Sequence, residues 1–133
     1  MKPAPFEYHA PSTIEEVLDL KHQHGDDAKF LAGGQSLVPA MNFRIVQPSV
    51  LIDLNRVNEL SYIREDKKVI RVGAMARERH LEFDKAIQNH TPLLHEAVPF
   101  IAHPQIRNRG TIGGSIVNAD PAAELPVDRK SVV

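Results

Sequence analysis

Two glycine doublets, each beside a small hydroxyl residue, are the features of this sequence that could do chemistry. The first lies in residues 31–37 (LAGGQSL) and the second in residues 110–116 (GTIGGSI). Because glycine has no Cβ, the backbone N–H groups of such a segment can turn toward one point and a ligand can approach them closely. Successive N–H groups turned in this way form a nest for an anion. A single doublet is usually only a turn, but two similar doublets indicate a ligand with two neighbouring anionic groups, such as a diphosphate.

The composition excludes several other kinds of ligand. The formal net charge of the 133 residues is −1, so there is no electrostatic case for nucleic acid or for an acidic membrane surface. No apolar run is long enough to span a bilayer. The N-terminus lacks the apolar region of a signal peptide, so the expected compartment is the cytoplasm. There is no cysteine, so an iron–sulfur cluster with cysteine ligands would have to lie on another chain.

No group of side chains indicates a proton-transfer catalyst or a metal site. The seven histidines are scattered, and no Ser/His/Asp set is legible. His22 and His24 are two positions apart on an expected helix and would face different ways, which favours a solvated surface over a metal pair.

The residues around the first doublet predict a small β/α unit. Ser12 and Glu15 have the spacing of a capping box, so a helix is expected over residues 13–24, with Gly25 as its stop. The apolar run at residues 50–54 is typical of a buried strand. The other expected elements are strands over 6–9 and 29–32 and a helical turn within 40–46.

A Rossmann interpretation of this unit has one point in its favour and two against it. Asp53 follows Gly33 by 20 residues, where a dinucleotide fold has its ribose-binding acid. However, the segment lacks the G-x-G-x-x-G pattern. Pro39 also falls where the phosphate-binding helix should already be running. We therefore reject the Rossmann fold and expect Asp53 to be an ordinary strand-end residue.

The second half of the chain predicts an antiparallel hairpin followed by helices. Residues 60–64 and 69–74 flank a charged turn, which is the pattern of a hairpin. Thr91 and Pro92 are a typical helix start, and Pro99 should kink or end that helix. The remaining expectations are a helix over 77–88 with Leu81, Ala86 and Ile87 inward, an apolar face of Leu93, Leu94, Ala97, Val98 and Ile101, a basic loop over 103–110, and a strand over 115–118.

Three blocks of this sequence resemble one family. They are residues 32–37 (AGGQSL), 107–115 (RNRGTIGGS) and 118–126 (NADPAAELP). The family is the FAD-binding medium subunit of the molybdenum hydroxylases, of the carbon monoxide dehydrogenase and xanthine dehydrogenase type. The resemblance covers about residues 1–127 and implies an α+β fold, the p-cresol-methylhydroxylase-type FAD-binding domain. In that fold a small β/α subdomain, here about 1–57, precedes a subdomain with an antiparallel sheet and helices, here about 58–127, and FAD lies between them.

The resemblance also implies which residues meet the cofactor. The first block would bind the pyrophosphate through backbone N–H groups and the Ser36 hydroxyl, and the second block through the segment that ends at Ser115, where the family often has Asn. Asp120 matches a carboxylate placed to hydrogen-bond a ribityl or ribose hydroxyl; a cap before Pro121 is an equal alternative. Valine at Gly33 or Gly113 should abolish binding, because a Cβ blocks positive φ and fills the phosphate's space. The implied cofactor-binding residues are Ala32, Gly33, Gly34, Gln35, Ser36, Ala102, Ile106, Thr111, Ile112, Gly113, Gly114, Ser115 and Asp120. Arg107 and Arg109 could contact phosphate or a partner subunit, and surface solvation is at least as good an interpretation.

The implied function is an electron outlet rather than a site of acid–base catalysis. A molybdenum-binding large subunit would oxidise a small substrate, and 2Fe-2S clusters on a small subunit would pass electrons to FAD and then to an acceptor. Two alternatives remain open at this point. One is a single-chain FAD-dependent oxidase or reductase on the same fold, and the other is a non-enzymatic domain in which both doublets are turns.

The resemblance stops near Val127, and the family is about twice as long. A common sequencing adapter translates to the last six residues, 128–133 (DRKSVV), and a stop. We therefore expect a fragment that ends in a non-native tail and that by itself is inactive.

Overall fold

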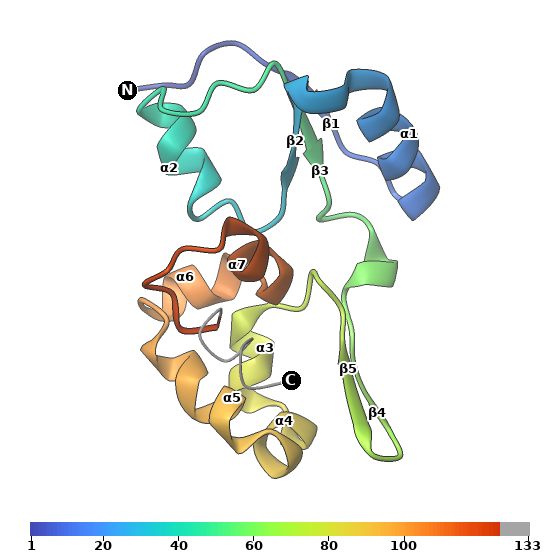
Figure 1. Ribbon diagram of the computed structural model, residues 1–133, viewed down its shortest axis with the longest axis vertical. Helices are drawn as coiled ribbons and strands as arrows, with labels where there is room; N and C mark the ends of the chain where they lie inside the picture. Colours follow the sequence, from blue (N-terminus) through green and yellow to red (C-terminus); the bar gives the residue numbers. More distant parts are fainter. Residues whose placement is uncertain (126–133) are drawn as a thin grey trace. The chain divides into compact units, whose positions relative to one another are not determined.

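The structure is a computed structural model that describes residues 1–125, and the suspected tail at 128–133 lies outside them. The chain divides into two compact units, one formed by Met1–Glu59 and the other beginning at Leu60. Together the units combine helices with small open sheets (Figure 1). Between residues 1 and 125, no helix has the length and apolar character that crossing a membrane requires.

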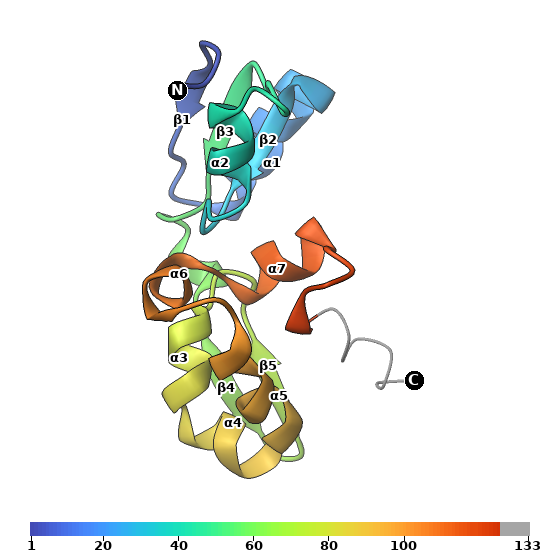
Figure 2. The same cartoon turned by 90° about the vertical axis from the view of Figure 1, so that its left-hand side faces the viewer.

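The first unit is built on a parallel sheet whose central strand is the apolar run. Strand β3 (Val50–Asp53) pairs with β1 (Glu7–His9) on one side and with β2 (Ala28–Leu31) on the other. All four residues of β3 are buried, which is why the run is continuously apolar up to Asp53. The two helices of this unit, α1 (Ile14–His24) and α2 (Leu37–Asn42), lie on opposite sides of the sheet (Figures 1 and 2).

Helix α1 begins one residue later than its sequence pattern suggested. Its N-cap is Thr13, whose Oγ1 accepts from the Glu16 N–H at 3.2 Å. In return, the Glu16 carboxylate accepts from the Thr13 N–H at 3.3 Å and from the Ser12 N–H at 2.7 Å. The capping box is therefore Thr13 with Glu16, and the prediction of Ser12 with Glu15 is wrong by one position. Gly25 ends the helix at φ +52°, as expected.

Helix α2 starts before Pro39, whereas the sequence placed a helical turn after it. Pro39 is the third residue of α2, where its missing N–H has no carbonyl partner to lose. Pro39 was therefore a poor argument against a Rossmann fold. The three-stranded parallel sheet, of order β1-β3-β2, gives a better argument, because the open Rossmann sheet is wider and differently ordered.

The second unit opens with the expected antiparallel hairpin. Strand β4 (Ile63–Asp66) pairs with β5 (Val69–Val72) through a turn in which Lys67 has φ +55°. The inward side chains Ile63, Ile70 and Val72 pack against a core formed by Leu81, Ile87, Val98 and Leu125.

Several short helices replace the longer ones that the apolar pattern predicted. Asp84 breaks the expected helix over 77–88 by capping the second of two helices, α3 (Glu78–Phe83) and α4 (Lys85–His90). Leu81 and Ile87 are fully buried, as predicted, whereas Ala86 is only partly buried. Helix α5 (Pro92–Ala97) passes into a 3₁₀ turn (Val98–Phe100) at Pro99, which confirms the expected break. Leu93 is exposed, so only part of the expected apolar face reaches the core.

The last two helices overturn two expectations. The basic segment is not a loop: it forms α6 (Pro104–Arg109), which starts with proline at its first position. The segment 115–118 is not a strand: it belongs to α7 (Ile112–Asn118), which Thr111 caps by accepting from the Gly114 N–H at 3.1 Å. The Thr111 cap is a helix-start signal that the β-branched residues Ile116 and Val117 obscured.

Candidate functional site

The first doublet forms a loop between the end of β2 and the start of α2. Gly34 has φ +75°, a conformation that favours glycine, and Gly33 has an ordinary φ. A Cβ on Gly34 would lie 3.1 Å from Leu31 Cδ1 and 3.2 Å from Val38 Cγ2. The requirement for positive φ therefore belongs to Gly34, and the expectation that Gly33 and Gly113 carried it is wrong.

The carbonyl groups at the start of this loop are bound by the protein. Leu54 N–H donates to Leu31 O at 2.9 Å, and Asn55 Nδ2 donates to Ala32 O at 2.9 Å. Gln35 Nε2 bends back to Gly33 O at 2.9 Å. The loop is thus fixed from its carbonyl side.

The N–H groups of the same loop are left available. Within residues 1–125, the backbone N–H groups of Gly33, Gly34, Gln35 and Ser36 donate no hydrogen bond, and the Ser36 side chain does not cap α2. An ordered loop with bound carbonyls and unpartnered N–H groups is the arrangement that an anionic ligand completes. The first doublet therefore fits the diphosphate of FAD.

Asp53 and Asn55 support this loop, and no pattern in the sequence indicated Asn55. Asp53 Oδ1 accepts from the Asn55 backbone N–H at 2.8 Å and from Asn55 Nδ2 at 2.5 Å, so it orients the amide that binds Ala32 O. Asp53 Oδ2 accepts from the Tyr8 hydroxyl, and this hydrogen bond raises the pKa of Tyr8. Asp53 is therefore an internal support of the loop as well as the last residue of its strand.

The second doublet is a helix start whose N–H groups are already used. Ile112 N–H donates to Ala76 O at 3.1 Å and Gly113 N–H to Ala74 O at 2.9 Å, while Gly114 N–H bonds the Thr111 hydroxyl oxygen. The expected backbone nest is therefore absent from these three residues. A Cβ on Gly113 would lie 2.6 Å from Ala74 O, so this glycine allows two backbones to approach each other. Ser115 is half-buried, and its hydroxyl has no partner between residues 1 and 125.

The remaining predicted residues of this unit lie near α6 and after α7. Ala102 has φ +40° and is exposed just before α6, and Ile106 is half-buried within α6. Asp120 Oδ1 accepts from the Ala122 N–H at 2.9 Å, so its carboxylate caps a turn, as one of the two interpretations required. Arg107 is buried rather than solvated: it bonds Glu82 and two backbone carbonyls. Arg109 is exposed.

Glu78 is a buried carboxyl group beside the second doublet that no sequence pattern indicated. It is 4% exposed, its Oε2 has no hydrogen-bond partner within the described residues, and a Cβ on Gly110 would lie 2.4 Å from that atom. Burial, followed by the nearby Glu124 charge, raises the pKa of Glu78 to about 7. Only the absence of a side chain at Gly110 makes room for this carboxyl group.

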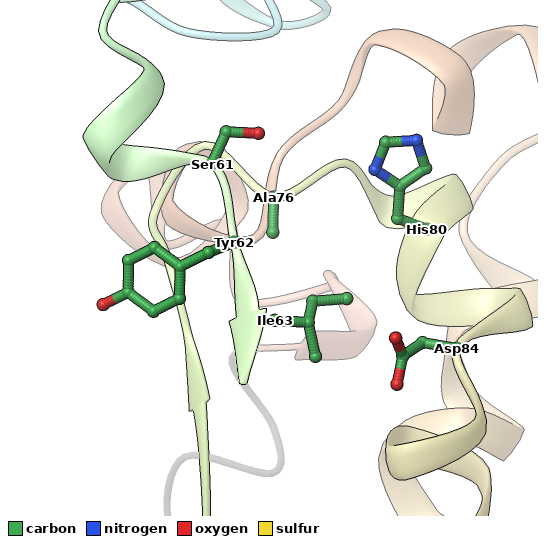
Figure 3. A pocket seen from close by; sticks show the side chains of 6 residues that line it. All are labelled: Ser61, Tyr62, Ile63, Ala76, His80 and Asp84. Atoms are coloured by element: carbon green, nitrogen blue, oxygen red, sulfur yellow. The ribbon is translucent and has the colours of Figure 1, made fainter. Parts of the chain in front are cut away.

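Histidines and acids do not form a metal site in the described part of the chain. His22 is exposed, but His24 is half-buried with its ring centroid 5.5 Å from that of His9, so only His22 fits the solvated interpretation. A pocket beside α3 has His80 and Asp84 on one wall and Ile63 on the other (Figure 3). The Asp84 carboxylate is occupied in capping α4, and none of the predicted cofactor residues lines this pocket.

Comparison with known proteins gives a consistent result. A family model described as the FAD binding domain in molybdopterin dehydrogenase matches residues 4–128. The 6-hydroxypseudooxynicotine dehydrogenase complex subunit alpha of Paenarthrobacter nicotinovorans is 54% identical over 96% of this chain and 43% of that protein. The carbon monoxide dehydrogenase medium chain of Hydrogenophaga pseudoflava is 49% identical over 95% of this chain and 44% of that protein.

Solved structures agree with the sequence matches. A carbon monoxide dehydrogenase from Hydrogenophaga pseudoflava, which lacks the Mo-pyranopterin moiety of its molybdenum cofactor, superposes with a TM-score of 0.93 at 50% identity, covering 95% of this chain and 44% of that one. Quinoline 2-oxidoreductase from Pseudomonas putida 86 superposes with a TM-score of 0.91 at 40% identity and the same coverage. The chain thus spans less than half the length of the relatives that it matches.

Proposed function

Because the chain belongs to the family of FAD-binding domains in molybdopterin dehydrogenases, we propose that it holds FAD in the medium subunit of a molybdenum hydroxylase complex. The family match argues against the alternative of a non-enzymatic domain in which both glycine doublets are turns. It also confirms the expected α+β FAD-binding fold, and it supports the proposed oxidoreductase class.

The observation that carries the proposal is the set of unpartnered N–H groups at Gly33–Ser36. Their carbonyl neighbours are fixed by Leu54 and Asn55, so the loop keeps its shape without a ligand. N–H groups that are already oriented bind an anion without a large ordering cost. We assign residues 32–36 to the FAD diphosphate on this ground.

The second unit contributes side chains in this proposal, since its N–H groups are used internally. Ser115 offers a free hydroxyl at the start of α7, and Asp120 keeps a second carboxylate oxygen beyond the one that caps its turn. Ala102 and Ile106 supply aliphatic contact for a planar ring system. The resemblance also assigns Thr111, Ile112, Gly113 and Gly114 to FAD. In this proposal they form the start of α7 and so position the Ser115 hydroxyl.

The partners follow from what this chain lacks. Bound FAD supplies the redox chemistry, receiving electrons and passing them to an external acceptor. The chain has no cysteine to hold a cluster, so we propose that 2Fe-2S clusters lie on a small partner subunit and the molybdenum cofactor on a large one. Two relatives carry names that describe one chain of a larger enzyme, a medium chain and a complex subunit, which favours this arrangement over a single-chain oxidase or reductase.

The test compares FAD with FMN, which has the flavin but no diphosphate. The experiment uses this chain extended to the length of its relatives, stripped of flavin and titrated by fluorescence quenching. We expect FAD to bind at least about tenfold more tightly than FMN, corresponding to about 1.4 kcal/mol. ADP should compete with FAD, since it carries the same diphosphate. Equal affinity for FAD and FMN, without competition by ADP, would contradict the assignment of residues 32–36.

A further inference from the structure

Arg107 is a buried cation that reaches three acceptors on two other segments. Its side chain is 7% exposed. Nε donates to Glu82 Oε2 at 3.1 Å, and Nη1 donates to Pro99 O at 3.2 Å and to Ile101 O at 2.9 Å. Arg107 therefore ties α6 to α3 and to the connection that leads from α5 into α6.

Glu82 fixes the position of the Arg107 guanidinium. The Glu82 side chain is 14% exposed and its Oε2 also accepts from Arg79 Nη1 at 3.0 Å, so the carboxylate is held from two sides. Glu82 lies on α3 next to Leu81, which is fully buried in the core. Because Glu82 is held firmly, Arg107 is fixed relative to the core, and its remaining N–H groups can set the position of flexible backbone.

The backbone that Arg107 holds includes a residue in an unfavourable conformation. Ala102 has φ +40°, a left-handed conformation that a residue with a Cβ adopts only when its surroundings impose it. The carbonyl that Arg107 bonds at 2.9 Å belongs to Ile101, the peptide group that leads directly into Ala102. The bond to Pro99 O fixes the preceding turn as well, so both ends of this short stretch are set by one side chain.

We propose that Arg107 is a positioning residue for FAD, acting through the Ile101–Ala102 peptide. The proposal rests on the proposed function, because it takes Ala102 and Ile106 as residues that meet the cofactor. Arg107 holds Ala102 in its left-handed conformation through the bond to Ile101 O. It also fixes the position of Ile106, which precedes it on α6. Its guanidinium touches no cofactor in this role; it decides where the aliphatic contacts lie.

Arginine suits this site because two of its side-chain nitrogens, Nε and Nη1, bond three acceptors. A planar guanidinium offers several N–H donors in a fixed fork, whereas lysine offers one compact charged group on a flexible stem. Arg107→Lys should therefore keep the ion pair with Glu82 and lose the bonds to Pro99 O and Ile101 O. Arg109→Lys is the matched control, because Arg109 lies on the same helix with an exposed side chain.

The experiment measures the apo-protein and FAD binding separately, using the same extended protein as the FAD titration. In the apo-protein, we expect Arg107→Lys to accelerate amide hydrogen exchange across residues 100–106, while the control leaves it unchanged. In the titration, we expect FAD affinity to fall by about tenfold and the visible absorption band of the bound flavin to shift. Ala102→Gly, which removes the steric cost at φ +40°, should recover part of the affinity of the Arg107→Lys protein.

The outcomes separate this inference from the proposed function. Faster exchange with unchanged FAD affinity and spectrum would show that Arg107 only stabilises the fold, and would overturn the inference while leaving FAD binding intact. A parent protein that does not bind FAD would overturn both. If Arg107→Lys fails to fold, Glu82→Gln loosens the same anchor while keeping an oxygen acceptor, and it must then weaken FAD for the inference to stand.

Discussion

Gly34 is the one residue of the first doublet whose backbone demands glycine. Gly25 offers a matched control, because it also has positive φ, at +52°, and a Cβ there meets nothing within 4 Å. We expect Gly34→Ala to weaken FAD by about tenfold or more, since the loop must shift, and Gly25→Ala to cost about 1 kcal/mol of stability with no effect on FAD. Fluorescence titration and urea unfolding of both variants provide the measurements. Equal FAD affinities in the two variants would show that the loop geometry does not matter for binding.

Asp120 has a structural role already, and a second role in FAD binding is testable. Its Oδ1 caps Ala122, a bond that asparagine can replace. We expect Asp120→Asn to keep the melting temperature of the apo-protein and, if the carboxylate bonds a cofactor hydroxyl, to lose about 1.5–3 kcal/mol of FAD binding. Asp120→Ala should lose about 1 kcal/mol of stability in addition. An Asn variant that binds FAD normally would leave Asp120 as a cap alone.

Glu78 makes the stability of the protein depend on pH. Its pKa rises from 4.5 to about 7 on folding, so the folded state keeps the proton that the unfolded chain releases. The contribution of Glu78 to the free energy of unfolding should therefore be fully present below pH 4.5, fall as the pH rises toward about 7, and level off above it, by an amount on the order of 3 kcal/mol.

Glu78→Gln tests this dependence, because glutamine cannot lose a proton. We expect the variant to be more stable than the parent protein at about pH 8 and nearly equal to it at about pH 4, by thermal melting across that range. Glu96→Gln serves as the control, since Glu96 is exposed on α5. If the melting temperatures of the parent and of Glu78→Gln changed with pH in the same way, ionisation of Glu78 would not affect stability.

At the scale of elements, two neighbouring hydroxyl residues have different roles at the start of α1. Thr13 caps the helix, whereas Ser12 contributes only its backbone N–H to the Glu16 carboxylate. We expect Thr13→Ala to lower the free energy of unfolding by about 1 kcal/mol and Ser12→Ala to change it very little. Urea denaturation measures both. A larger loss at Ser12 would restore the capping box of Ser12 with Glu15.

The two glycine doublets are different elements despite their similar sequences. The first ends a strand and leaves four N–H groups without partners in the described chain, while the second starts a helix and bonds its N–H groups to Ala74, Ala76 and Thr111. The difference lies in what each segment meets. The first is supported through its carbonyls by Asn55, and the second packs backbone to backbone against residues 74–76.

At the scale of the whole molecule, the 133-residue chain carries less than half of its relatives' length. In the described residues, the hairpin of β4 and β5 pairs with no third strand, and a two-stranded sheet is marginal by itself. We expect the 133-residue chain expressed alone to aggregate or to lack bound flavin, and expect a protein extended to the length of its relatives to be yellow. Size-exclusion chromatography with flavin absorbance is the measurement. A cooperatively melting 133-residue monomer with stoichiometric FAD would contradict this expectation.

The sequence by itself determined the features that depend on neighbouring residues. The apolar run at residues 50–54 predicted β3, the charged turn predicted the hairpin, and Pro99 predicted the break after α5. The three blocks of the resemblance predicted the FAD-binding family. Segments that approach a cofactor closely tolerate few residue types, so their pattern is visible in the sequence alone.

Only the tertiary structure decided the features that depend on distant residues. Pattern alone could not show that the basic Arg107 is buried, because its burial requires Glu82, 25 positions earlier, to lie beside it. Asn55 supports a loop 23 positions away, and the second doublet finds its acceptors in residues 74–76. Hydrogen-bonding groups are satisfied by whichever segment the fold brings near, so the same glycine pair is an open nest in one place and a closed helix start in the other.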